Sequence, residues 1–282
     1  MELAWIIFLF LVGIIFIVKG GDFFVDAASW IAEVSGIPKL IIGATIVSLA
    51  TTLPELLVSV MAAVRKNVDM AIGNAVGSVT ANIGLIMAIS LICMPAVIKR
   101  ADYLMKSLLM LAAAALIVAC GFLGETGIGI SAVLIVIFLV FLWENVTSAR
   151  RSMRQGQEGE KRRLKTGKKE IGINIAKFVV GAVGIVWGAD LLVDNGSALA
   201  AMAGIPERVI GVTIIAVGTS LPELITTITA IVKKQSSLSV GNILGANIID
   251  LSLILPLSAL VSGQALPITE TAARSVVPPR PS

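Results

Sequence analysis

The sequence predicts an all-α integral membrane protein in which two inverted-topology repeats of transmembrane helices enter the bilayer in opposite senses. Hydrophobic residues make up 57% of the 282 positions and charged residues 14%, whereas a typical soluble domain carries about 25% charged residues. A polar sequence around Glu55 recurs without gaps around Glu223, 168 positions later (223 − 55 = 168). An ungapped repeat over that length indicates internal duplication. Five predicted spans make up the first repeat, and this odd number inverts the direction of the second.

Eight apolar segments are predicted to cross the bilayer as helices, the first of them slightly short unless it extends through residues 19–21. The first lacks the basic start and the small-residue cleavage site of a signal peptide, so we expect it to be retained. Asp22, Asp26 and Glu33 follow it in a predicted amphipathic connector. The predicted spans are about 3–18, 40–64, 70–97, 104–123, 128–143, 173–192, 209–232 and 238–261.

These segments divide the chain into four regions. We predict a first repeat over 1–149, a basic linker over 150–170, a second repeat over 171–262 and a polar tail over 263–282. The first repeat holds five spans and the second holds three, so a full arrangement of five plus five would need two more helices after residue 262. We therefore expect about eight spans, with the last two missing from this chain.

The charge distribution predicts the topology. Nine basic residues lie between Arg150 and Lys169, in a segment with almost no apolar content. The positive-inside rule places this linker in the cytoplasm, and counting back five spans puts the N-terminus outside. We predict a multi-pass inner-membrane protein with the lipid bilayer as its partner. Because the positive charge is concentrated in the linker, it indicates topology and not a nucleic-acid partner.

Glu55 and Glu223 each follow a Leu-Pro pair in the middle of an apolar run. A charge at such a depth costs roughly 2.5–3.5 kcal/mol on insertion scales, so each glutamate is a candidate functional residue. A proline inside a helix leaves the carbonyl four residues earlier without its donor, and such backbone is tolerated only where it is buried in protein or lines a cavity. Hydroxyl and amide groups accompany both glutamates at helical spacing: Thr51, Thr52, Ser78, Asn82, Thr219 and Ser220, with Asp250 at the position that matches Asn82.

These groups would form a cluster of hard oxygen ligands near the middle of the membrane, with up to three negative charges. Oxygen-only ligand sets suit hard cations such as calcium, which takes about 6 to 8 oxygens. The chain has no histidine, and Cys93 and Cys120 lack metal-binding spacing, which excludes histidine acid–base chemistry and gives no support for thiolate sites. We predict no cofactor and no enzymatic activity.

A purely structural interpretation is the alternative. Leu-Pro-Glu would be a kink whose glutamate pairs with another helix, and the Gly-Asn segments would be small-residue helix packing. The duplication argues against this, because no lysine or arginine lies in the predicted cores of the spans that carry the two glutamates. We still assign the glycines to packing: Gly73, Gly77, Gly241 and Gly245.

The two copies read ATTLPE at 50–55 with GNAVGSVTAN at 73–82, and GTSLPE at 218–223 with GNILGANIID at 241–250. With these motifs the chain resembles the calcium/cation antiporter superfamily, in particular prokaryotic sodium/calcium exchangers, over residues 13–259. The resemblance implies that calcium is bound by Glu55, Glu223, Thr51 and Thr219. It implies that sodium is bound with help from the carbonyls of Ser48 and Ala216 and from Thr52, Ser220, Ser78, Asn82 and Asp250.

Two positions depart from the family pattern: alanine stands at 50, where the family usually has glycine, and at 246, where it usually has serine. The resulting hypothesis is a secondary antiporter that exchanges Ca2+ against Na+ by alternating access. A proton-coupled exchanger of calcium or another divalent cation, using the same glutamates, is the nearest alternative. An intramembrane hydrolase with paired carboxylates and an inactive truncated fragment are further alternatives, and the oligomeric state is left open.

Overall fold

The computed structural model describes residues 2–66, 68–93, 100–123, 128–158, 167–204, 218 and 220–263. All regular secondary structure within these ranges is helical, as a chain in hydrocarbon requires, because a helix pairs its backbone groups within one segment. The first half contains α1 (Glu2–Ser35), α2 (Lys39–Ile42), η1 (Gly43–Val47), α3 (Ser48–Thr51), α4 (Leu53–Val64), α5 (Val68–Ala81), η2 (Asn82–Met87), α6 (Ala88–Cys93), α7 (Arg100–Leu123) and α8 (Ile128–Glu158). The second contains α9 (Lys168–Met202), α12 (Leu221–Val232), α13 (Ser236–Ile249), η4 (Asp250–Ile254) and α14 (Leu255–Ser262).

Six helical segments of the described residues are long and apolar enough to cross a membrane, and a seventh span results if the bent pair 39–51 and 53–64 is one span. These seven correspond to seven of the eight predicted spans. The eighth, 209–232, is described only from residue 218 onward, where α12 forms its second half. The predicted polar tail lies outside the described residues after Gly263.

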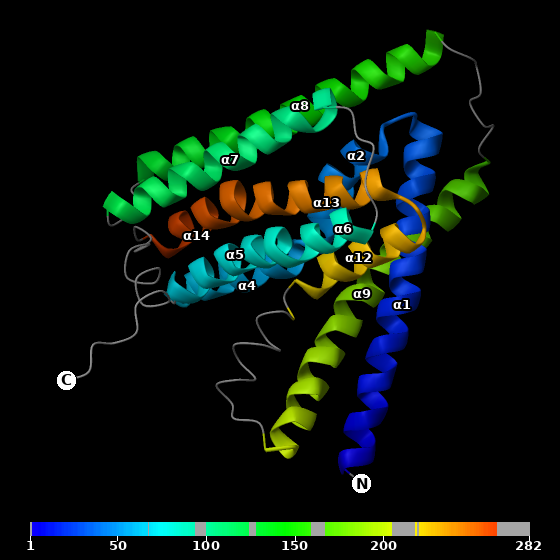
Figure 1. Ribbon diagram of the computed structural model, residues 1–282, viewed down its shortest axis with the longest axis vertical. Coiled ribbons are helices and arrows are strands. Elements are labelled where there is room, and N and C mark those ends of the chain that lie inside the picture. Colours follow the sequence, from blue (N-terminus) through cyan, green and yellow to red (C-terminus); the bar gives the residue numbers. More distant parts are fainter. Residues whose placement is uncertain are drawn as a thin grey trace.

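The first predicted span is longer than expected. Instead of ending near Val18, α1 continues without interruption to Ser35 and includes the acidic segment that we predicted to be a connector. It lies antiparallel to α9 along most of its length, and the two run steeply across the other helices (Figure 1). Glycines allow this close approach: a Cβ atom on Gly20 would lie 2.9 Å from the carbonyl oxygen of Gly181. A larger side chain at Gly20 would therefore push the helices apart.

The helix α13 forms the centre of the fold. Every residue from Leu238 to Ile249 is buried, although the surrounding helices expose many apolar side chains on the outside of the molecule. It packs against the α2, η1 and α3 segments of the first repeat and against α12 and α7 (Figure 1). A fully buried helix can place polar side chains away from both water and lipid, and α13 leads directly to Asp250.

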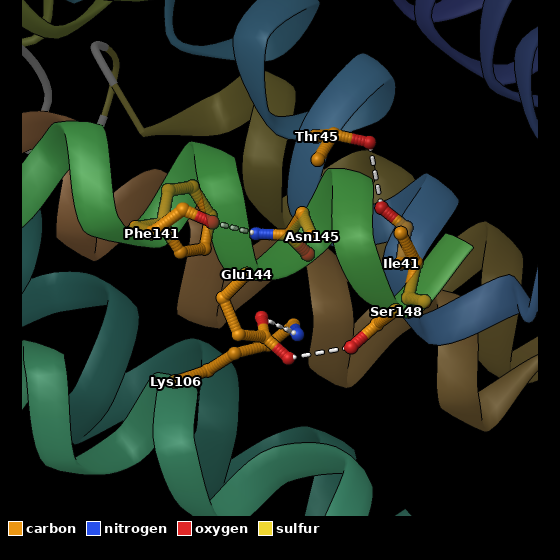
Figure 2. A network of polar contacts seen from close by, with 7 residues as sticks. All are labelled: Ile41, Thr45, Lys106, Phe141, Glu144, Asn145 and Ser148. Atoms are coloured by element: carbon orange, nitrogen blue, oxygen red, sulfur yellow. Dashed lines mark hydrogen bonds and ion pairs between the residues drawn. The ribbon is translucent and has the colours of Figure 1, made fainter. Parts of the chain in front are cut away.

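The helices α7 and α8 form an antiparallel hairpin that covers α13, and a buried ion pair joins them. The ammonium of Lys106 lies 2.6 Å from Oε2 of Glu144, and the Lys106 side chain is only 1% exposed. Ser148 donates a hydrogen bond of 2.9 Å to the other oxygen of Glu144 (Figure 2). The Lys106 side chain is therefore held inside the protein by its own carboxylate partner.

Candidate functional site

Two interrupted helices present the glutamates. The axis of the second span turns by 47° between Thr51 and Leu53, and α4 then begins with Leu53 and Pro54 in its first turn. In the second repeat α12 begins in the same way with Leu221 and Pro222. Proline is tolerated there because the first N–H groups of a helix have no partner within it. The predicted break is confirmed in the first copy, whereas residues 205–217 before α12 lie outside the described residues. Each glutamate lies in the first turn of its helix, where the backbone dipole favours a negative charge.

Both glutamates are completely buried. Glu55 and Glu223 have no exposed surface, and both carboxylate oxygens of Glu55 and Oε2 of Glu223 have no hydrogen-bond partner among the described residues. No ion pair of the described residues involves either glutamate, and Lys106, a buried lysine, is paired with Glu144. An isolated buried carboxylate is highly unfavourable, so these oxygens require a proton or a cation.

Hydrogen bonds connect the two repeats across the site. Thr52 Oγ1 donates to Oε1 of Glu223 at 3.1 Å, and the hydroxyls of Ser78 and Ser220 lie 3.2 Å apart. We had expected Thr51 and Thr52 to lie on the same helix face as Glu55. The hydroxyl of Thr52, at the bend, in fact contacts the glutamate of the other repeat, a contact that helical spacing did not predict.

Thr51 contacts the second repeat as well, since its hydroxyl donates to Oδ1 of Asn242 at 3.3 Å. The same hydroxyl lies 3.3 Å from the carbonyl oxygen of Ser48, which also accepts the N–H of Thr52 at 2.9 Å. The Ser48 carbonyl, a predicted ligand, therefore accepts the Thr52 N–H, and it competes with Asn242 for the single proton of the Thr51 hydroxyl. A cation could take the place of the Thr51 hydroxyl beside the Ser48 carbonyl without breaking the backbone hydrogen bond from Thr52.

Asn82 and Asp250 occupy equivalent places at the edge of the cluster. Each is the first residue of a π-helical segment, η2 for Asn82 and η4 for Asp250. Both side chains are fully buried, and none of their polar side-chain atoms has a partner among the described residues. Short π-helical segments are frequent at functional sites because they redirect side chains out of the regular helical register. Sequence reasoning found both residues but not the π-helices.

Three acidic side chains are buried in this part of the bundle: Glu55, Glu223 and Asp250. Within the described residues, however, no group of three or more His, Cys, Asp or Glu side chains is arranged to hold one metal ion. The expectation of a single cage with three negative charges is therefore not met there. The structure instead gives one buried glutamate at the start of α4, one at the start of α12, and Asp250 at the start of η4.

Sequence reasoning missed Asn74 and Asn242. The Asn74 amide donates to the carbonyl oxygen of Glu55 at 3.1 Å and to Ser59 Oγ at 2.9 Å, which fixes the first turn of α4. Asn242 is its equivalent in the second repeat and contacts Thr51. The 168-residue offset was a usable signal, because it pairs these asparagines as it pairs the glutamates.

The family model of the sodium/calcium exchanger protein matches residues 5–146 and 173–278. The chain belongs to this family. The two matched segments contain Glu55 and Glu223 respectively, and they account for most of the chain. As a member of the sodium/calcium exchanger family, the chain is a multi-pass membrane protein.

Several relatives resemble this exchanger-family chain over most of its length. The inner membrane protein YrbG of Escherichia coli is 37% identical over 260 residues, which cover 90% of this chain and 79% of YrbG. The sodium/calcium exchanger MaX1 of Methanosarcina acetivorans is 32% identical over 292 residues, covering 89% and 81%. The solved structure of the sodium-calcium exchanger NCX_Mj soaked with Na+ and Sr2+ matches with a TM-score of 0.80 and 27% identity, covering 96% of this chain and 87% of that one.

The structure brings together most of the predicted site residues. Thr219 and Ala216 lie outside the described residues, so their places in the site stay predictions. The remaining members are all buried within the bundle: Ser48, Thr51, Thr52, Glu55, Ser78, Asn82, Ser220, Glu223 and Asp250. Their side chains carry carboxylate, hydroxyl and amide oxygens, a donor set that suits hard cations.

Proposed function

We propose that this chain is a secondary antiporter that exchanges Ca2+ against Na+ across its membrane by alternating access. One observation carries the proposal: two glutamates, one from each repeat, are fully buried and retain carboxylate oxygens without a hydrogen bond or an ion pair among the described residues. Burying these unpaired carboxylates costs too much free energy unless a mobile cation supplies the missing positive charge.

The ligands divide by chemistry. We assign calcium to Glu55 and Glu223 together with Thr51 and Thr219, because two carboxylates neutralise one divalent ion and hydroxyls complete a flexible oxygen shell. We assign sodium to the neutral oxygens around this pair and to the single outlying carboxylate: the carbonyls of Ser48 and Ala216, and the side chains of Thr52, Ser220, Ser78, Asn82 and Asp250.

The exchange mechanism follows from charge. An empty site would hold several buried negative charges and could not be closed off from water at an acceptable energy. The protein therefore changes sides only when one divalent ion or several monovalent ions occupy the site. Because both ions need the same glutamates, transport of one requires the return of the other, which is antiport and not uniport.

The relatives support this assignment. MaX1 bears the name sodium/calcium exchanger, and NCX_Mj is a sodium-calcium exchanger whose crystals were soaked with Na+, Ca2+ or Sr2+. Together with the paired glutamates, these similarities support a transporter and not a hydrolase.

We propose the topology given by the positive-inside rule, with the N-terminus outside and the 150–170 linker in the cytoplasm. The similarity to YrbG, an inner membrane protein, supports the inner membrane as the location. On this topology the connection between α4 and α5 faces outward, and the connection between α12 and α13 faces the cytoplasm.

Uptake of calcium-45 into proteoliposomes tests the proposal. Vesicles loaded with sodium and diluted into choline buffer should accumulate calcium, and those with equal sodium on both sides should not. A separate arm imposes a pH gradient without sodium. Uptake that follows the pH gradient and ignores sodium would overturn sodium coupling and favour the proton-coupled alternative. The Glu55→Gln variant serves as the inactive control in both arms.

A further inference from the structure

Lys233 ties the end of α12 to α1. Its ammonium lies 2.8 Å from Oδ1 of Asp26 and 3.2 Å from Oδ1 of Asp22. The two aspartates are one helical turn apart on α1, so both reach the same ammonium. Close backbone packing accompanies these ion pairs, since a Cβ atom on Gly21 would lie 2.6 Å from Oγ1 of Thr229 on α12. The protein is therefore closed at this end, between α1 and α12.

The other repeat contains the same groups. The 168-residue offset pairs Asp22 and Asp26 with Asp190 and Asp194 on α9, and it pairs Lys233 with Arg65 at the end of α4. Local backbone geometry follows the same symmetry, because the residue after each basic side chain has a positive φ, 61° at Lys66 and 56° at Lys234.

The second set of groups is not joined. Asp190, Asp194 and Arg65 are exposed, and none of them takes part in an ion pair among the described residues. A cavity of about 120 Å³ separates α9 from α4, and it is lined by Asp190 and Asp194 on one side and by Val58 and Pro54 on the other. Such a space is large enough for water. The cavity also reaches Pro222, the residue before Glu223.

The two ends lie on opposite sides of the molecule. In Figure 1, α4 runs toward the left edge and α12 toward the right edge, where its end lies beside α1. On the proposed topology, the Lys233 end is cytoplasmic and the Arg65 end is outside, so the structure is open outward and closed inward.

We infer that these groups form two alternating latches of the transport cycle: Lys233 with Asp22 and Asp26 holds the state seen here, and Arg65 with Asp190 and Asp194 holds the opposite-facing state. The inference rests on the proposed antiport function and identifies residues that select between its two states. It assigns a partner to each of three charged side chains that form no ion pair with another described residue in the present state.

Packing between α1 and α9 makes the two latches exclusive. The glycine contacts between Gly20 and Gly181 leave no room for one helix to slide far from the other, so both move as a unit. A shift that closes the cavity between α9 and α4 also moves α1 away from α12 and breaks the Lys233 pairs. Ion pairs with partly exposed partners suit this role, because each contributes little and can break once in every cycle.

Cross-linking tests the inference. In a Cys93→Ser, Cys120→Ala background, the pair Asp26→Cys with Lys233→Cys reports the state seen here, and Asp194→Cys with Arg65→Cys reports the opposite one. A short bifunctional thiol reagent should join both pairs in sodium-containing membranes without calcium. The matched controls replace Lys233→Cys by Lys234→Cys and Arg65→Cys by Lys66→Cys. No joining of the 65 and 194 positions above its control would overturn the inference.

Charge removal supplies an independent measurement. Lys233→Gln should lower the ratio of the first cross-link, scored between positions 22 and 229, to the second by about two- to five-fold, because it removes the partly exposed ion pair with Asp26 that remains once position 22 is cysteine. Arg65→Gln, scored with a cross-link between positions 58 and 190, should shift the balance in the opposite sense. Lys234→Gln and Lys66→Gln should leave both ratios unchanged, and shifts in the same direction for Lys233→Gln and Arg65→Gln would contradict the inference.

The readout separates this inference from the proposed function. Cross-link yields are measured without calcium. If both cross-links form but sodium gradients drive no calcium-45 uptake, the ion assignment fails and the latches stand. Conversely, sodium-driven uptake that is unchanged after the 65 and 194 positions have been joined leaves the antiporter intact and overturns the latch.

Discussion

Thr52 of the first repeat donates a hydrogen bond to the carboxylate of Glu223 in the second repeat, with Oγ1 and Oε1 3.1 Å apart. The bend of 47° at this residue makes the contact possible. Each repeat thus supplies part of the coordination of the other, and the site exists only where the two copies meet. This is why one copy of the motif alone would bind a cation weakly.

Thr52→Val should weaken calcium binding, because it leaves Glu223 without its donor and removes one oxygen from the cluster. Hydrogen bonds to charged groups contribute about 1.5–3 kcal/mol, which corresponds to roughly ten-fold to over a hundred-fold in affinity. Calcium titration in sodium-free detergent buffer, followed by thermal unfolding, measures the effect. Thr52→Ser keeps the hydroxyl and should stay near wild type; equal loss in both variants would show that packing and not the hydroxyl matters.

Ala246 offers a gain of function. It is fully buried on α13, one turn before Asp250, and the 168-residue offset pairs it with Ser78. Ala246→Ser would add an oxygen to the proposed sodium ligands, worth about 1–3 kcal/mol in a desolvated site. The sodium concentration that displaces calcium should fall, while calcium affinity without sodium stays nearly unchanged. A calcium affinity that shifts as much as the sodium requirement would exclude residue 246 from a sodium site.

The ion pair of Lys106 and Glu144 should matter for stability and not for binding. Lys106→Met leaves a carboxylate without its partner inside the protein, which costs about 3–5 kcal/mol, so the melting temperature should fall clearly. Adding Glu144→Leu to this variant removes the unpaired charge and should recover most of the loss. Calcium-dependent stabilisation should persist in both proteins. A double variant no more stable than Lys106→Met would indicate that the pair itself is needed.

The inverted arrangement predicts opposite exposure for equivalent turns. Lys66 and Lys234 each follow the end of a glutamate-bearing helix with a left-handed backbone. In a background without Cys93 and Cys120, a membrane-impermeant thiol reagent should label Lys66→Cys from outside in intact cells and Lys234→Cys only after the membrane is opened. Labelling of both from the same side would contradict the opposite orientation of the repeats.

Much of the site could be predicted because duplication marks it. A single glutamate after a Leu-Pro pair can occur by chance. The same groups at the same spacing 168 positions later indicate that both copies contribute to one site. Membrane insertion energetics then identify the carboxylates, since an unpaired charge in an apolar span demands a functional reason. The helical class follows from the same physics, because lipid offers no partner to backbone groups.

Contacts between distant parts of the chain could not be predicted. The connector predicted after residue 18 is part of α1, whose Asp22 and Asp26 contact Lys233, more than 200 positions later. The partner of Lys106 could not be predicted either, since Glu144 lies on another helix. The π-helical segments that begin at Asn82 and Asp250 depend on packing and carry no local sequence signal.

The central claim is that Glu55 and Glu223 hold one and the same calcium ion between the repeats. Equilibrium binding of calcium-45 to the purified protein in sodium-free buffer tests it directly, with Glu55→Gln and Glu223→Gln as single variants. We predict one calcium ion per chain in the wild type. Calcium affinity should be at least about 100-fold weaker in each variant, because only one carboxylate is then left to neutralise the divalent ion. Two ions per wild-type chain, or one ion bound at near wild-type affinity by either variant, would contradict the shared site.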